Sequence, residues 1–148
     1  MERNMLTRRK LAYPLFGVCV LLSNAAALQT MYGSVEIKNT TLTQPVKIVG
    51  MGKIRDTVVD HDLRVFGFLK SRNSHFLSNL HATGSDLSLC QDQVEGDVHI
   101  TNYVKRPRLY LDQSKISGKV IFHGAVRGRV VMDKGSVIAQ GIENGDVV

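Results

Sequence analysis

Residues 87–100 read LSLCQDQVEGDVHI, and residues 109–122 read LYLDQSKISGKVIF. The two stretches carry apolar or small residues at the same alternating places, and the pattern returns from Val130 onward. An alternation with period two is typical of strands, because successive side chains of a strand point to opposite faces. Leu87 to Leu109 is a step of 22 residues, and Leu109 to Val130 is a step of 21. The C-terminal half therefore predicts short strands in a repeat of about 22 residues.

A repeat of this length that holds three short strands predicts a single-stranded parallel β-helix, an all-β solenoid in which apolar side chains stack from coil to coil. The alignment places Val137 in the row of Val94 and Ile116, and extends back from Leu87 to Val65. We expect about five short coils over residues 28–148, with residues 28–62 less regular and a candidate capping coil. The alternative is an antiparallel β-sandwich, which also has short strands at close spacing.

The N-terminus has the order of an export signal. Arg3, Arg8, Arg9 and Lys10 precede an almost wholly apolar run, residues 11–23, that is too short to span a bilayer as a permanent helix. The small residues that follow it predict cleavage after Ala27, so that residues 1–27 are a signal peptide. We therefore expect a protein exported to the periplasm or cell envelope of a bacterium, with no transmembrane span in the mature form.

The charge of the chain weakens a nucleic-acid function. The formal net charge is +6, but residues 1–27 hold four basic residues and one acidic residue, so half of the excess lies in the expected signal peptide. Only Cys90 remains after cleavage, so the mature chain can close no internal disulfide. Its stability must come from packing.

The segments VEGDV (94–98), ISGKV (116–120) and VRGRV (126–130) share a short valine and glycine pattern. Through them, residues 94–147 resemble the bactofilin-like, polymer-forming β-helix proteins. The resemblance implies a β-helix that acts as a filament or scaffold protein inside the cell, whereas this chain carries an export signal. It covers about the last 60 residues, and its pattern is one that any β-helix favours.

A basic face is the first candidate binding surface. If Leu109 and Leu111 point inward, the neighbouring arginines point outward, and a 21-residue step places two pairs of arginines on adjacent strands. The candidate residues are Arg106, Arg108, Arg127 and Arg129, with Lys105 at a corner beside them. Guanidinium groups bind phosphate or carboxylate bidentately, so an anionic envelope polymer or lipid head groups are candidate ligands. Asp86 falls beside Arg108 and partly neutralises this face.

The last apolar residues are the second candidate surface. A stack of coils leaves unpaired backbone groups at its ends, and such edges pair readily unless they are covered. The candidate edge for docking a protein partner or a second copy consists of Val137, Ile138, Ile142, Val147 and Val148.

Other polar clusters give weaker signals. Residues 60–62 (Asp-His-Asp) are interpreted as a solvated turn, and His75, His81, His99 and His123 lack the spacing of a metal site. Asp112 and Asp133 occupy matching corners, but Cys90 interrupts that row. Nucleic acid is a poor candidate ligand, because only Tyr110 and Tyr103 are available to stack on bases near the arginines.

These observations predict a non-catalytic envelope protein, with no metal ion and no cofactor. We expect it to work through its surface as a structural scaffold or as a component of a larger assembly, such as a secretion apparatus. The alternative is a small carbohydrate-binding or carbohydrate-active β-helix protein, which would need a cleft with two carboxylates at a defined separation.

Overall fold

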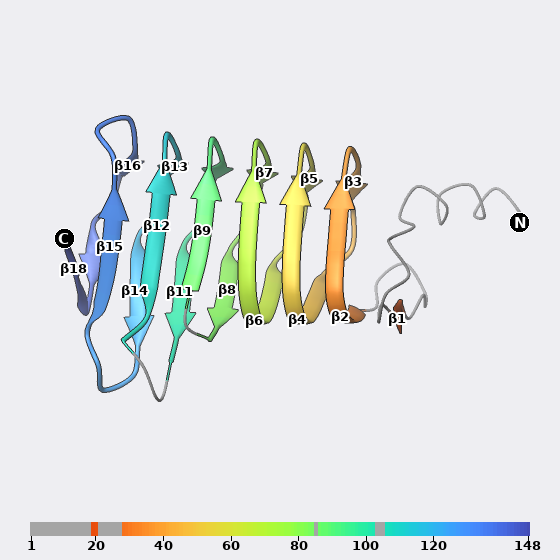
Figure 1. Ribbon diagram of the computed structural model, residues 1–148. Coiled ribbons are helices and arrows are strands. Elements are labelled where there is room, and N and C mark those ends of the chain that lie inside the picture. Colours follow the sequence, from red (N-terminus) through yellow and green to blue (C-terminus); the bar gives the residue numbers. More distant parts are fainter. Residues whose placement is uncertain (1–18, 21–27, 85, 103–105) are drawn as a thin grey trace, which may run out of the picture.

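The computed structural model describes residues 19–20, 28–84, 86–102 and 106–148. These residues form strands joined by turns, and none of them is helical. Parallel strands stack as a β-solenoid of about seven coils (Figure 1). This confirms the predicted fold class and excludes the antiparallel sandwich, but the expected number of coils, about five, was too low.

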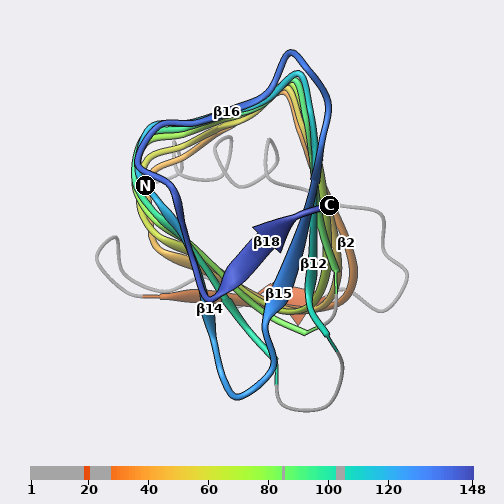
Figure 2. The ribbon, with the colours of Figure 1, turned by 90° about the vertical axis from the view of Figure 1, so that its left-hand side faces the viewer.

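Seen along its axis, the solenoid has three faces (Figure 2). The first coils run through two of these faces in single ten-residue strands, which are β2 (Gln29–Lys38), β4 (Val46–Arg55) and β6 (Leu63–Arg72). Beyond β6, two short strands take the place of each long one. The first half of β6 therefore pairs with one short strand, and its second half pairs with another.

The first face continues the first halves of the long strands with β8 (Leu80–Thr83), β11 (Val98–Thr101), β14 (Val120–His123) and β17 (Ile142–Glu143). The second face continues their second halves with β9 (Asp86–Cys90), β12 (Arg108–Asp112), β15 (Gly128–Met132) and β18 (Gly145–Val147). The third face is a row of two-residue strands: β3 (Thr41–Leu42), β5 (Val58–Val59), β7 (His75–Phe76), β10 (Gln93–Val94), β13 (Lys115–Ile116) and β16 (Val137–Ile138).

Apolar residues at equivalent positions of successive coils form inward rows, and these rows are the core. Val98 lies between Leu80 and Val120 on the first face, and all three are fully buried. On the second face Leu109 lies between Leu87 and Val130, as the sequence predicted. Parallel strands lie about 4.8 Å apart, so each row is a continuous column of packed side chains.

The coil length changes along the chain, and this corrects the expected repeat. In the first coils equivalent residues lie 17 apart, as Thr57 and Ser74 do. In the later coils they lie 22 apart, as Asp92 and Ser114 do. The longer coils add residues mainly at the corner between the first and second faces, where residues 102–107 connect β11 to β12 and residues 124–127 connect β14 to β15. The 22-residue repeat is thus a shorter coil with an insertion.

Two expectations that rested on a uniform repeat are wrong for this reason. Val65 pairs with Ala82, not with Leu87. Ile138, not Val137, follows Ile116, because the last corner is one residue longer. Within residues 28–62, β2 and β4 pair over ten successive residues, and the capping coil expected there stays a prediction.

The corner between the second and third faces is built from a row of positive-φ residues followed by a row of inward polar residues. The first row consists of Asn39, Asp56, Asn73, Gln91 and Gln113, with φ between 50° and 55°. The second row consists of Thr57, Ser74, Asp92, Ser114 and Ser136, and the backbone amide of each of the first four donates to a side-chain oxygen of the next member. The turn thereby satisfies buried donors that would otherwise be costly.

The corner between the first and second faces depends on glycine, and we call it the glycine corner. Gly33, Gly50, Gly67 and Gly84 are stacked there in successive coils with positive φ. A Cβ atom on Gly67 would lie 2.1 Å from the carbonyl oxygen of Gly50. Only glycine combines this backbone conformation with so close an approach of two coils.

The two ends of the solenoid differ. At the N-terminal end, β1 (Cys19–Val20) pairs antiparallel with β2. At the other end β16, β17 and β18 are each the last strand of their row, and no described residue pairs with their outer edges. The predicted signal peptide, residues 1–27, lies mostly outside the described residues.

Candidate binding surfaces

The basic face that the sequence predicted is called the arginine face from here on. Its residues lie on the second face of the solenoid and on the connections next to it. Arg108 and Arg129 are paired in register on β12 and β15, as the sequence predicted. Arg106 and Arg127 are exposed on the two preceding connections. Lys105 lies outside the described residues.

Two of the four arginines are already paired with carboxylates. Arg108 Nε lies 3.2 Å from Asp86 Oδ1, which is the neutralisation that the sequence indicated. Arg127 lies 2.6 Å from Asp146, and this hydrogen bond, with the charges of Arg127 and Arg106, holds the pKa of Asp146 below its ordinary value. The arginine face therefore offers less free positive charge than its composition suggests.

The predicted docking edge is the last coil. Ile138 lies in β16, Ile142 in β17 and Val147 in β18, and the two isoleucines pack against the core. Val137, Val147 and Val148 are 48%, 57% and 67% exposed. The last coil thus combines exposed apolar side chains with strand edges to which no described residue is paired.

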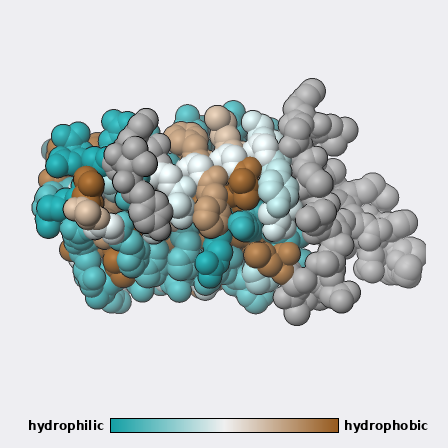
Figure 3. Space-filling view, turned by 90° about the horizontal axis from the view of Figure 1, so that it is seen from below, coloured by the Kyte–Doolittle hydropathy of each residue, from teal (hydrophilic) through white to brown (hydrophobic). Residues whose placement is uncertain are grey.

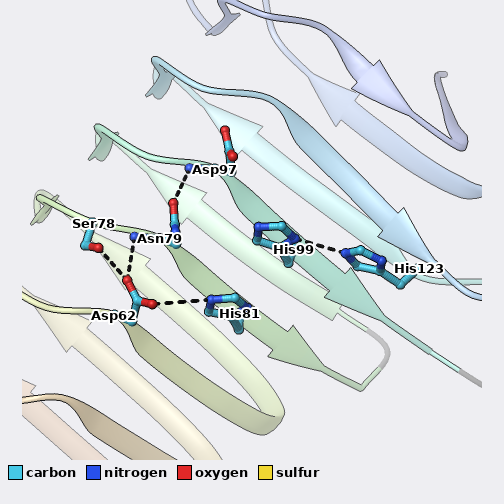
Figure 4. Close-up of polar contacts among 7 residues, drawn as sticks. All are labelled: Asp62, Ser78, Asn79, His81, Asp97, His99 and His123. Carbon is cyan, nitrogen blue, oxygen red and sulfur yellow. Dashed lines mark hydrogen bonds and ion pairs between the residues drawn. The ribbon is translucent and has the colours of Figure 1, made fainter.

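Three histidines form a stack on the outer side of the first face (Figure 4). His81 on β8 and His99 on β11 have ring centroids 4.8 Å apart, and those of His99 and His123 on β14 are 5.2 Å apart. His99 Nδ1 and His123 Nε2 lie 2.9 Å apart and share a hydrogen bond. The sequence analysis did not find the contact between His99 and His123, because the loop insertions change their spacing.

A carboxylate closes the stack at one end. Asp62 Oδ2 lies 3.6 Å from His81 Nε2, and Asp62 Oδ1 accepts hydrogen bonds from the Ser78 hydroxyl and the Asn79 amide. Burial acts to raise the pKa of Asp62, but these two hydrogen bonds and the charge of His81 hold it below its ordinary value. Asp62 is therefore part of a local network and not of a free three-residue cluster with Asp60 and His61, both of which are exposed.

His99, the central histidine, is harder to protonate than an ordinary histidine. Burial lowers the pKa of His99, and positive charge on His81 and His123 lowers it further, while Asp97 and Asp62 oppose the effect. Histidines change charge near neutral pH. His99 therefore gains its charge at a lower pH than an ordinary histidine does.

Two rows of cations on the second face were not singled out from the sequence. Lys38, Arg55 and Arg72 form one row, and Lys53 and Lys70 form the next. All five are exposed, and their side chains make no hydrogen bond or ion pair within the part of the chain that the structure describes. The two rows border a hollow of about 370 Å³, whose floor includes Ser71 and Ser88. A 17-residue step, which relates Arg55 to Arg72 and Lys53 to Lys70, would have revealed both rows.

The carboxylates considered for carbohydrate chemistry do not face each other across a cleft. Asp112 lies against Cys90, whose sulfur is 3.6 Å from Asp112 Oδ2. Asp133 accepts hydrogen bonds from Gln113 and Ser136. Among the described residues, no group of three or more histidine, cysteine, aspartate or glutamate side chains is arranged to hold a metal ion.

Within the same described ranges, no helix has the length and apolar character needed to cross a membrane. Comparison of the sequence and structure with known proteins finds no matching family model, no matching characterised protein and no matching solved structure. The resemblance to the bactofilin-like proteins therefore stays a prediction.

Proposed function

We propose that this chain is an exported, non-catalytic scaffold of the cell envelope that assembles through the last coil of its solenoid. The observation that carries the proposal is the open edge of β16, β17 and β18, whose outer backbone groups pair with no described residue. Unpaired edges of this kind add further strands unless they are blocked.

The side chains of the last coil favour association rather than protection. Val137 and Val147 are about half exposed, beside the partly buried Ile138 and Ile142. Solenoids usually end in a polar cap that keeps them soluble. Glu143 and Asp146 act against pairing, but Glu143 is held by Lys119 at 2.7 Å and Asp146 by Arg127. Both charges are thus directed toward their own molecule.

The export signal in residues 1–27 supports the envelope as the place of action, and the resemblance to polymer-forming proteins agrees with a scaffold. The partner is a second copy of the chain or another component of a larger assembly. A solenoid suits either role, because each coil adds the same strand spacing and the end coil is a ready template for the next.

The test is the molar mass of the protein in solution, measured by light scattering over a range of concentrations. We expect the mass of the parent protein to rise with concentration. The double variant Val137→Lys, Val147→Lys should stay monomeric, because two ammonium groups at the edge oppose strand addition.

A matched control is Thr41→Lys, Leu77→Lys, because both side chains are exposed but lie on earlier coils, on β3 and just after β7. The control should associate like the parent. A parent protein that is monomeric at every concentration would exclude self-assembly. Pull-down of envelope proteins with the parent and with the edge variant would then test for another partner. If both retained the same proteins, the last coil would have no role in binding.

A further inference from the structure

The glycine corner carries a ridge of exposed apolar side chains. Tyr32, Met51 and Phe66, which flank the stacked glycines, are 45%, 44% and 42% exposed. Val49 and Phe68 lie beside them and are partly exposed. We call these five residues the apolar ridge. Exposed apolar side chains gathered on one side of a protein usually mark a contact surface.

The same side of the molecule is seen from below in Figure 3, where apolar patches lie among hydrophilic surface. The connection between β14 and β15 leaves this corner too and extends beyond it (Figure 2). It adds the exposed Ala125 and the partly exposed Val126. Apolar groups are therefore present on this side in both the short and the long coils.

Cations border the ridge on both sides. On the first face, Lys47 and Arg64 are neighbours, and Lys47 Nζ lies 4.8 Å from the centroid of the Phe66 ring. On the second face, Lys53 and Lys70 are neighbours, and the row of Lys38, Arg55 and Arg72 lies beyond them. The nearest acidic side chain in these rows is Glu36, in register with Lys53.

These cations differ from the two paired arginines of the arginine face, because the described part of the chain gives them no ion-pair partner. Arg108 and Arg127 are held by aspartates. By contrast, no described carboxylate lies within ion-pair distance of Lys47, Lys53, Arg64 or Lys70. As far as the described residues extend, the charge that surrounds the ridge is therefore not used in an internal ion pair.

From this arrangement we propose that the glycine corner docks on an anionic lipid bilayer. The apolar ridge enters the interface between head groups and acyl chains, while the flanking lysines and arginines contact lipid phosphates. Peripheral binding depends on this combination of apolar burial and attraction to anionic lipid. A soluble polyanion would use the cations but would leave Met51 and Phe66 exposed, so the apolar ridge favours a bilayer.

The first experiment measures co-sedimentation of the full chain with phosphatidylcholine vesicles that contain about one-third phosphatidylglycerol. Pure phosphatidylcholine vesicles report the contribution of the apolar residues 11–23, which every variant shares. We expect Lys53→Glu, Lys70→Glu to bind the anionic vesicles about 30-fold more weakly or worse. Met51→Ser, Phe66→Ser should also lose binding.

Two matched controls separate the ridge from general charge and hydrophobicity. Lys115→Glu, Lys134→Glu makes the same charge change away from the glycine corner, at exposed positions of the third face and its neighbouring turn. Leu77→Ser, Val131→Ser removes equally exposed apolar groups elsewhere. Equal losses in these controls would overturn the proposal.

The second experiment reads the ridge directly. An environment-sensitive fluorophore is attached to Met51→Cys or, as a control, to Leu77→Cys, in a background with Cys19→Ser and Cys90→Ser. We expect a blue shift with anionic vesicles only for the label at residue 51. The proposal fails if the label at residue 51 does not respond. A second result would also contradict the proposal. If Lys53→Glu, Lys70→Glu lost binding to inorganic polyphosphate while Met51→Ser, Phe66→Ser still bound vesicles like the parent, the surface would be a polyanion site.

Discussion

The backbone amide of Ser74 donates a 2.7 Å hydrogen bond to Oδ1 of Asp92 in the following coil. Asp92 is 1% exposed and is the carboxylate in a row whose other described members are hydroxyl residues. Burial raises the pKa of Asp92 to about 7, although hydrogen bonds from Ser74, Ser71 and the Cys90 amide act to lower it. The row therefore contains one group that titrates near neutral pH.

Replacing Asp92 with serine should make the stability of the protein less dependent on pH. Between about pH 4 and pH 7 the folded state holds a proton on Asp92 that the unfolded state has released. The contribution of Asp92 is therefore fully present below about pH 4 and is lost as the pH rises through 7. From about pH 4 to pH 8, the parent should lose about 4 kcal/mol relative to Asp92→Ser, measured by urea unfolding. If the stability of the parent and that of Asp92→Ser changed in the same way with pH, the three hydrogen bonds would offset the effect of burial on the pKa of Asp92.

Adjacent valines on β15 test the inward rows. Val130 is fully buried and Val131 is 39% exposed. Val130→Asp should reduce the free energy of unfolding by about 4 kcal/mol or more, because it places an unpaired charge between coils. Val131→Asp should change it by less than about 1 kcal/mol. Thermal unfolding followed by circular dichroism gives both values, and similar losses would contradict the assigned register.

The stacked glycines predict a strict requirement at the glycine corner. Gly67→Ala should cost roughly 3 kcal/mol of unfolding free energy, because the backbone has a φ of 138° and the new methyl group would meet Gly50. Gly135→Ala is the control, since the nearest atom to a Cβ atom there is Asp133 Oδ2 at 3.5 Å. Denaturant unfolding of the two variants should differ accordingly. An equal effect would mean that the coils can separate at this corner without loss.

His99 should make the protein less stable in mild acid. The pKa of His99 in the folded state is lowered, so below its ordinary value the unfolded state binds more protons. The contribution of His99 is present above about pH 6.5 and is lost as the pH falls through its folded pKa. His99→Gln should therefore lose less stability than the parent between about pH 7 and pH 5.

The control for this prediction is His61→Gln, which removes an exposed histidine outside the stack. Its pH profile, measured by urea unfolding, should follow the parent. If the pH profile of His99→Gln also followed that of the parent, protonation of His99 would not destabilise the folded protein.

The sequence predicted the solenoid and the inward rows of the later coils, because alternation and repetition both survive a change of loop length. It did not reveal the shorter coils, although Gly33, Gly50, Gly67 and Gly84 recur at a constant step. The apolar pattern of the first strands is interrupted there by the glycines themselves. An alignment anchored on the longer coils therefore places Val65 and Val137 in the wrong rows.

The candidate surfaces depended on the same register. Arg108 and Arg129 could be paired from the sequence because both lie in the longer coils. The two rows of cations were missed because they recur with the 17-residue step of the shorter coils. The histidine stack was missed because it spans the change in coil length. Sequence spacing also cannot report that Arg127 is held by Asp146, because that contact depends on side-chain conformation.

The stacking of coils also determines how the molecule would respond to mechanical force. The hydrogen bonds between coils run along the solenoid axis, so tension applied to the first and last coils would load them one coil at a time. Such a molecule yields by unzipping from an end, at low force, rather than by shearing many bonds together. A coil of 17 residues would release about 60 Å of chain, and a coil of 22 residues about 75 Å. A single-molecule extension trace would thus show two step sizes and report from which end the protein opens.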